Sequence, residues 1–153
     1  DLDLHMVRPG GVLWNGYAHG TSYPVTYSDC FFSTCKKEFE AGGNPVDWAE
    51  LGHPSLDIDD KNGYGPENIN DPYKSGLGDY DVYVHYWDSK YVSDPTTTAT
   101  LRIYVLGEKE LEITKTFTAE HQMWRVAGVR WLENDTGYIL DYDDDLVMDS
   151  HGQ

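Results

Sequence analysis

Basic residues are scarce in this 153-residue chain, which has 11 lysines and arginines against 27 aspartates and glutamates. The net charge of −16 excludes a nucleic-acid-binding protein, because such proteins present a basic face to phosphates. It equally argues against docking on anionic lipid. No stretch approaches the roughly 18 consecutive apolar residues of a membrane-spanning helix, and no signal-peptide pattern is present. Because the first residue is Asp1, we expect a processed product or an excised piece of a larger protein.

Cysteine is equally scarce, with only Cys30 and Cys35 in the chain. Two thiols cannot complete a four-ligand zinc site, and their spacing is not the C-x-x-C of redox proteins. The spacing predicts a local disulfide that ties a surface loop, with two free thiols as the alternative. Because disulfides persist in oxidising compartments, we expect a secreted or cell-surface protein.

Aromatic residues, in contrast, are abundant: they make up 14% of the chain, with 12 tyrosines and 5 tryptophans. A highly charged chain this rich in aromatics can build a core, so intrinsic disorder is excluded. Acidic and aromatic residues together indicate an extracellular domain that handles cations, carbohydrate or both. The alternative is that the charge only keeps the protein soluble.

Alternation of apolar and polar residues predicts β-strands in several segments. The clearest are residues 79–87 and 100–106, and a turn at Gly107-Glu108 then leads into 109–117, which predicts a hairpin. Within residues 123–131 the apolar parity changes at Ala127-Gly128. This change predicts a β-bulge there.

The rest of the chain completes an all-β pattern. A strand at residues 2–7 and a short one at 12–14 precede a long region, 15–54, rich in Gly, Pro, Ser and aromatics. We interpret that region as an inserted, disulfide-tied excursion with one short helix at 46–51. About eight or nine antiparallel strands in a chain of one-domain length predict a jelly-roll-like β-sandwich.

The C-terminal segment, residues 137–153, follows the predicted sandwich domain of residues 1–136. It has two apolar runs, 137–140 and 146–148, and four aspartates among residues 141–145 between them. Exposed apolar runs invite strand pairing, so we predict that at least one adds a strand to this sandwich or to a neighbouring subunit's. The acidic stretch is then a guard against edge pairing or a second cation site.

The N-terminal strand carries the first group of candidate ligands. Alternate residues of a strand point the same way, so Asp1, Asp3 and His5 share one face, while Leu2 and Leu4 face the core. We expect His5 to hydrogen-bond a carboxylate rather than to hold zinc.

A second acidic segment follows residue 55. Asp57 and Asp59 share a face opposite Leu56 and Ile58, which are expected to face inward, and a Gly-rich turn returns Glu67 toward them. This segment is not an EF-hand, because a lysine stands where the fifth position requires an oxygen ligand.

These paired carboxylates predict a calcium site. Two like charges about 5 Å apart cost about 3 kcal/mol at an effective dielectric near 20, and a hard divalent cation offsets that cost. Ca²⁺ takes 6–8 oxygen ligands. The predicted metal ligands are Asp1, Asp3, Asp57, Asp59 and Glu67. The alternative is a solvated acidic strand edge with an ordinary turn.

The same segments carry a resemblance. Three motifs are similar to those of a family of secreted bacterial domains of unknown function. They are Asp1-Leu2-Asp3-Leu4-His5, Leu56-Asp57-Ile58-Asp59-Asp60 and Gly63-Tyr64-Gly65-Pro66-Glu67-Asn68. These domains occur in large extracellular and envelope proteins of myxobacteria and other Gram-negative bacteria, beside von Willebrand factor A-like and macroglobulin-like segments. The resemblance covers about residues 1–131. It implies a β-sandwich with an acidic metal site at the five predicted ligands, and no known catalytic activity.

Catalytic motifs are absent. None of the six histidines lies in H-E-x-x-H, and there is no Gly-x-Ser-x-Gly elbow or phosphate-binding loop. Paired carboxylates are the groups of a glycosidase, but the metal site uses the same residues. We therefore predict a protein that is not an enzyme.

Aromatic side chains on outward strand faces form a candidate ligand platform for stacking sugar rings. Its members are Tyr83, His85, Trp87 and Tyr104, with Tyr91 nearby. Such binding rests on analogy with sandwich modules of this size, and the alternative is that these rings cover the sandwich.

The sequence thus predicts a non-enzymatic, calcium-binding extracellular β-sandwich with a structural or adhesive role, as a subunit of an assembly or on its own. The alternative function is a carbohydrate-binding module with a structural calcium ion. The expected partners are Ca²⁺ and either a glycan or a neighbouring protein subunit, without nucleic acid or membrane insertion.

Overall fold

The computed structural model describes most of the chain, namely residues 1–14, 28–35, 54–61, 65–71 and 76–149. These residues form strands, turns and irregular segments but no helix, so none of them belongs to an apolar membrane-spanning helix. The helix expected at 46–51 lies outside the described residues.

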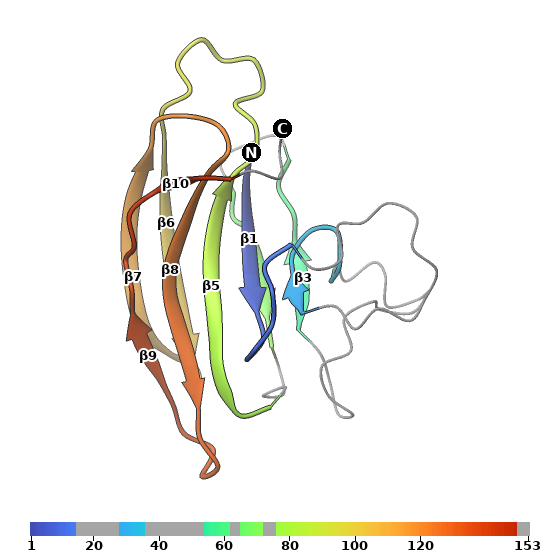
Figure 1. Ribbon diagram of the computed structural model, residues 1–153, viewed down its shortest axis with the longest axis vertical. Coiled ribbons are helices and arrows are strands. Elements are labelled where there is room, and N and C mark those ends of the chain that lie inside the picture. The colour runs from blue at the N-terminus through green and yellow to red at the C-terminus, as the bar shows by residue number, and fades with distance from the viewer. Residues whose placement is uncertain (15–27, 36–53, 62–64, 72–75, 150–153) are drawn as a thin grey trace.

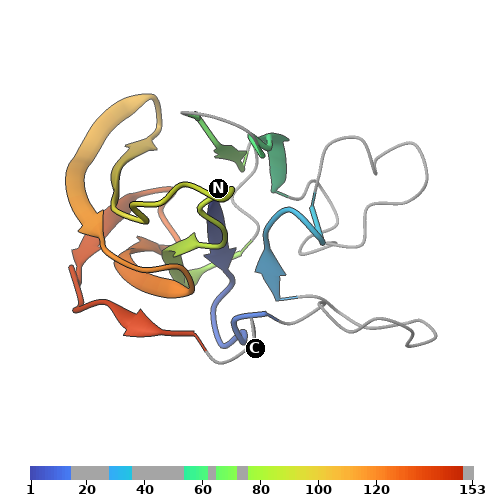
Figure 2. The same ribbon diagram turned by 90° about the horizontal axis from the view of Figure 1, so that it is seen from above.

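Ten strands follow one another along the described chain: β1 (Leu2–Val7), β2 (Asp29–Cys30), β3 (Ser55–Ile58), β4 (Asn68–Asn70), β5 (Gly78–Tyr86), β6 (Thr97–Val105), β7 (Glu108–Phe117), β8 (Gln122–Trp131), β9 (Gly137–Asp141) and β10 (Val147–Met148). Six form one sheet in the order β10-β8-β5-β1-β2, with β9 also beside β8. The pairs β3–β4 and β6–β7 lie against one face of this sheet (Figures 1 and 2). All pairings are antiparallel, and the predicted all-β sandwich is confirmed.

Local sequence signals place most of these strands. The N-terminal strand occupies the predicted residues, and the predicted hairpin joins β6 to β7. Its turn residues are Leu106 and Gly107, with φ of 52° and 87°, the left-handed values that a two-residue hairpin turn requires. The strand predicted at 12–14 is wrong, because Val12 bonds through both its N–H and its carbonyl to the Ser28 hydroxyl instead of to a neighbouring strand.

The predicted bulge in β8 is present, one residue earlier than expected. Val82 of β5 pairs with Ala127, and the next residue, Tyr83, pairs with Arg125, so Val126 is the extra residue. Its carbonyl accepts a hydrogen bond from the Asp143 N–H at 2.9 Å. The bulge therefore anchors the C-terminal segment.

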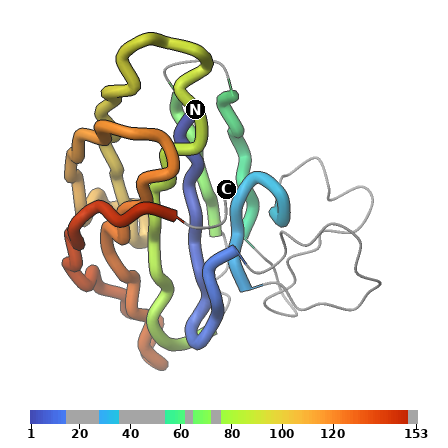
Figure 3. Tube along the Cα trace, turned by 45° about the horizontal axis from the view of Figure 1, so that its top comes forward, coloured from blue at the N-terminus to red at the C-terminus, as the bar shows by residue number. Residues whose placement is uncertain are grey.

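The C-terminal segment adds two strands to this sandwich, which confirms the prediction of at least one. Both β9 and β10 pair with β8, and Figure 3 shows the chain between them crossing the sheet. In that acidic connection, the Asp143 carboxylate lies 2.6 Å from the Lys115 ammonium and accepts a hydrogen bond from the Trp124 ring N–H. Asp144 lies 3.8 Å from Arg125. The acidic run therefore forms ion pairs on its own domain.

Apolar residues fill both sides of the large sheet. The main core, between the two layers, includes Trp124, Tyr80 and Phe117. On the opposite face, a smaller cluster of Trp14, Phe31 and Met123 covers the sheet. That second cluster decides which side chains of β1 and β5 are buried.

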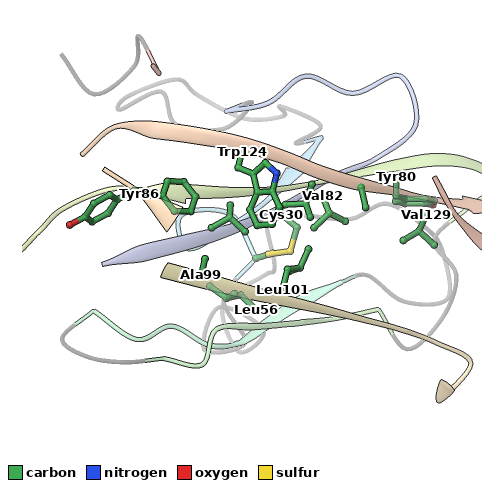
Figure 4. Packing of buried hydrophobic residues seen from close by; sticks show 14 of the residues in the cluster. Cys30, Leu56, Tyr80, Val82, Tyr86, Ala99, Leu101, Trp124 and Val129 are labelled. Atoms are coloured by element: carbon green, nitrogen blue, oxygen red, sulfur yellow. A yellow bond between two sulfur atoms is a disulfide. The ribbon is translucent and has the colours of Figure 1, made fainter. Parts of the chain in front are cut away.

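The predicted disulfide between Cys30 and Cys35 is confirmed. Both cysteines are fully buried and belong to the main core (Figure 4). The Cys35 carbonyl also accepts the Leu56 N–H at 2.8 Å, which joins this segment to β3. The disulfide therefore ties the loop that follows β2, as predicted, but its two cysteines are buried in the core and not at the surface.

Candidate metal centre

Three of the five predicted ligands meet at the start of β1. Side-chain oxygens of Asp1, Asp3 and Glu67 all lie within 4.8 Å of one another. Asp1 directly precedes β1, Asp3 is the second residue of β1, and Glu67 directly precedes β4. Two segments separated by more than sixty residues thus build one acidic cluster.

An open strand edge holds Glu67 in this position. β2 pairs with the last two residues of β1, and no other described strand pairs with this edge farther toward the N-terminus. There the Leu4 N–H donates to Glu67 Oε2 at 2.7 Å. Gly65, at a φ of 71°, provides the left-handed residue of the turn before Glu67, and its N–H donates to Asp60 at 3.0 Å.

The cluster holds buried oxygens that no hydrogen-bond donor satisfies. Asp3 is only 4% exposed. Asp1 Oδ1, Asp3 Oδ2 and Glu67 Oε1 are all buried without a hydrogen bond. An unsatisfied buried carboxylate oxygen costs several kcal/mol unless a cation neutralises it. The cluster thus has the electrostatics of an empty cation site.

The same environment changes the acidity of Glu67. Burial, followed by the negative charge of Asp3 and with a smaller contribution from Asp59, raises the pKa of Glu67 from 4.5 to about 8. The hydrogen bond from the Leu4 N–H opposes this rise. Without a cation, Glu67 therefore holds its proton at neutral pH.

The second acidic segment contributes one of its two predicted ligands to this region. Asp59 is within hydrogen-bonding reach of Glu67, and its side chain is only 11% exposed. Asp57 instead accepts a hydrogen bond from Ser55 at 2.7 Å and one from Asn68 at 3.4 Å. Asp57 is thus outside the cluster of three and stabilises the β3–β4 pair.

A break in strand register separates Asp57 from Asp59. Leu56 pairs with Ile69, but Ile58 pairs with Asn68, so Asp57 is an extra residue in β3. As a result Leu56 is buried, as predicted. Ile58, in contrast, is 46% exposed, so the prediction that it faces inward is wrong. A bulge of one residue reverses which side chains face inward.

A lysine borders the cluster. Lys90 Nζ lies 2.9 Å from Asp1 Oδ2 and 3.3 Å from Asp88 Oδ2. Its backbone has a φ of 53°, and the Asp88 carboxylate accepts its N–H at 2.6 Å. Lys90 thus competes with any metal for Asp1, a role that its position in the sequence does not reveal.

The two histidines of this region are buried behind the cluster. His5 Nδ1 lies 2.9 Å from Asp29 Oδ2, and both side chains are fully buried. The expected carboxylate partner of His5 is confirmed, but it is Asp29 of β2 rather than a residue of the cluster. His85 lies 3.9 Å from Asp3 and 3.6 Å from Asp149.

The predicted outward position of His85 is wrong. Its side chain has no exposed surface, because the ring of Trp14 and the C-terminal Asp149 cover that face of β5. His85 therefore lies beside the candidate ligand Asp3, at a distance of 3.9 Å that is too long for a hydrogen bond.

The predicted aromatic platform is not assembled. Tyr83 packs beside the second core, and Trp87 lies against the rings of His85 and His121. Tyr104 is on β6, in the other layer, and is 59% exposed. Tyr91 is 99% exposed in the connection between β5 and β6. The alternation of side chains along β5 places residues on one face but does not show what covers that face.

Comparison with known proteins identifies no relative. No family model matches the chain, and neither a curated protein nor a solved structure matches it. The resemblance to secreted bacterial domains, which the motifs carry, stays a prediction.

Proposed function

We propose that this domain is a non-enzymatic, calcium-binding extracellular module with a structural or adhesive role. The observation that carries the proposal is the acidic cluster of Asp1, Asp3 and Glu67, with its buried oxygens that lack donors. Such a cluster favours a bound cation, because without one Glu67 must take up a proton to offset the repulsion and the desolvation of the neighbouring carboxylates.

The chemistry of the ligands favours calcium over other metals. All three are carboxylates, the hard oxygen ligands of Ca²⁺ and Mg²⁺, whereas zinc prefers histidine and cysteine. Calcium–oxygen distances of about 2.3–2.6 Å place opposite ligands about 5 Å apart, while Mg²⁺ requires about 4 Å and near-octahedral geometry. The three oxygens lie within 4.8 Å of one another, close enough to share one Ca²⁺.

Two observations support an extracellular location. The disulfide is fully buried in the core, and disulfides of this kind are typical of oxidising compartments. The motif resemblance to secreted bacterial domains agrees with it. A module held by a metal and a disulfide at the surface of a cell suits an adhesive or structural role.

Calorimetric titration of the desalted protein with Ca²⁺ tests the proposal. We expect one calcium per chain with a dissociation constant of about 0.1–1 mM, the range of extracellular modules. Glu67→Gln is expected to weaken binding at least about tenfold, because a charged ligand is lost. Glu133→Gln, on an exposed residue outside the cluster, is the matched control. Equal affinities of the two variants would contradict the assignment of Glu67.

Neutralising Lys90 is expected to strengthen calcium binding. The ammonium of Lys90 lies 2.9 Å from Asp1 Oδ2, and an exposed ion pair is worth about 0.2–1 kcal/mol. Lys90→Met should therefore raise calcium affinity by about 1.5–5-fold in the same titration. Lys109→Met, on a lysine that pairs with Glu112 instead, should leave it unchanged. A weaker affinity of Lys90→Met would show that the lysine supports the site.

A further inference from the structure

The acidic cluster opens onto a hollow with a volume of about 240 Å³. Asp1, Asp3 and Glu67 belong to one side of this hollow, and the first residues of β6, including Thr97, belong to the other. In Figure 2 the start of β1 and the strand β6 face each other across the sandwich. The residues of the cluster thus form part of the wall of this hollow, although their unpaired oxygens are themselves buried.

With one oxygen from each carboxylate, the cluster of Asp1, Asp3 and Glu67 fills only part of a calcium shell. Ca²⁺ takes 6–8 oxygen ligands, and the cluster has three carboxylates. Part of their capacity is already used, since Glu67 Oε2 accepts the Leu4 N–H and Asp1 Oδ2 pairs with Lys90. Ligands on the side of the hollow can fill the remaining places.

A second hollow of about 250 Å³ continues the first along β6. The two share Leu4 and Leu101 as lining residues, so the two hollows adjoin along that strand, and together they are called the groove below. Asn68, Asn70 and Tyr104 belong to the lining of the second hollow, together with one residue of each charge, Asp71 and Arg102. In the described part of the chain, β6 pairs only with β7, so its other edge also presents peptide groups to the groove.

This combination of groups suits a neutral, polyhydroxylated ligand. Hydroxyl, amide and peptide groups hydrogen-bond to hydroxyls, the apolar floor at Leu4 and Leu101 packs against C–H groups, and Tyr104 offers a ring face. A net charge of −16 repels anions. A cationic ligand would compete with the metal for the carboxylates.

We propose that this groove binds a neutral oligosaccharide, and that two adjacent hydroxyls of one sugar complete the coordination of the bound calcium. The proposal rests on the proposed calcium site and names its ligand. The calcium is then part of the binding surface and not only a structural ion. Tyr104 and the two asparagines contact the sugars farther along the groove.

A glycan array that carries neutral and sialylated oligosaccharides, probed with the whole domain, tests the proposal. In millimolar calcium we expect binding to neutral glycans, and loss of that binding in EGTA or when Mg²⁺ replaces Ca²⁺. The strongest neutral glycan is then titrated calorimetrically. Tyr104→Ala should weaken its binding about tenfold. Tyr91→Ala, on a more exposed tyrosine outside the lining of the groove, should bind as the unaltered protein does.

The other possible results separately reject the glycan ligand, the calcium site or the groove. Calcium binding by calorimetry without any glycan binding would reject the ligand and leave the calcium proposal intact. Absence of calcium binding would reject both. Selective binding of sialylated glycans would reject the neutral ligand, and loss of binding in Tyr91→Ala but not in Tyr104→Ala would reject the groove.

Discussion

Calcium at about 10 mM is expected to raise the melting temperature of the metal-free protein by about 3–10 °C, and EGTA is expected to reverse the rise. A ligand that binds only the folded state stabilises it by about 1.4 kcal/mol at a tenfold excess over its dissociation constant and by about 2.7 kcal/mol at a hundredfold excess, the range that this concentration covers for a dissociation constant of about 0.1–1 mM. For a domain of this length each kcal/mol shifts the melting temperature by about 2–4 °C. Thermal unfolding followed by circular dichroism, in calcium and in EGTA, measures the shift. Identical melting curves would remove the basis of the calcium proposal.

Substitution of Asp3 should abolish this response. Asp3 is 4% exposed and has a buried oxygen without a hydrogen bond. Asp3→Asn keeps the volume but removes the charge, so the metal-free protein should melt higher while calcium no longer adds stability. Asp145→Asn, on an exposed residue of the acidic connection between β9 and β10, makes the same chemical change and should retain the full calcium response. A normal calcium response in Asp3→Asn would show that the cluster is wrongly assigned.

The metal-free protein is expected to lose stability as the pH rises from about 5 to 8. The pKa of Glu67 is 4.5 in the unfolded chain and about 8 in the folded protein, so between these values the folded state binds more protons. Stability then falls with rising pH, by at most about 1.4 kcal/mol per pH unit for one group. The contribution is fully present below pH 4.5 and is lost as the pH passes 8.

Urea unfolding at several pH values, in EGTA and in calcium, measures this dependence. Carboxylates whose pKa is lowered by partners, such as Asp79 beside Arg130 and Asp143 beside Lys115, are ionised throughout this window and do not contribute. Glu67→Gln should flatten the fall, because glutamine does not titrate, whereas Glu133→Gln should keep it. In the unaltered protein, calcium should also remove the fall, because the metal holds Glu67 ionised. An equal slope in both variants would assign the pH dependence to other groups.

Local alternation made much of the fold predictable. The strand at the N-terminus, the β6–β7 hairpin and the added C-terminal strands each follow from patterns that span fewer than twenty residues. The bulge in β8 was placed within one residue, because a change of apolar parity marks where the register shifts. The strand expected at residues 12–14 failed because a side chain, Ser28, took the backbone partners that a strand would need.

The two acidic segments of the candidate site were predictable from the sequence, but the way in which they assemble was not. That Asp1 and Asp3 share a face follows from the period of a strand, and the tight turn before Glu67 follows from its glycine. The sequence does not show which carboxylates of the second segment join them. A single extra residue in β3 places Asp57 beside Ser55 and Asn68, while Asp59 lies near Glu67. Lys90 enters the site only because the β5–β6 connection folds back over the N-terminus.

By itself the sequence determined the fold class, the disulfide and the two acidic half-sites, because all of these depend on residues close together in the chain. The tertiary structure alone decided burial, as His85 shows. Its place on β5 sets which face it occupies, but Trp14 and Asp149, from the two ends of the described chain, cover that face. Alternation orders side chains relative to their neighbours in a strand. What lies over them, and hence their solvation and charge, depends on segments that only the folded chain brings together.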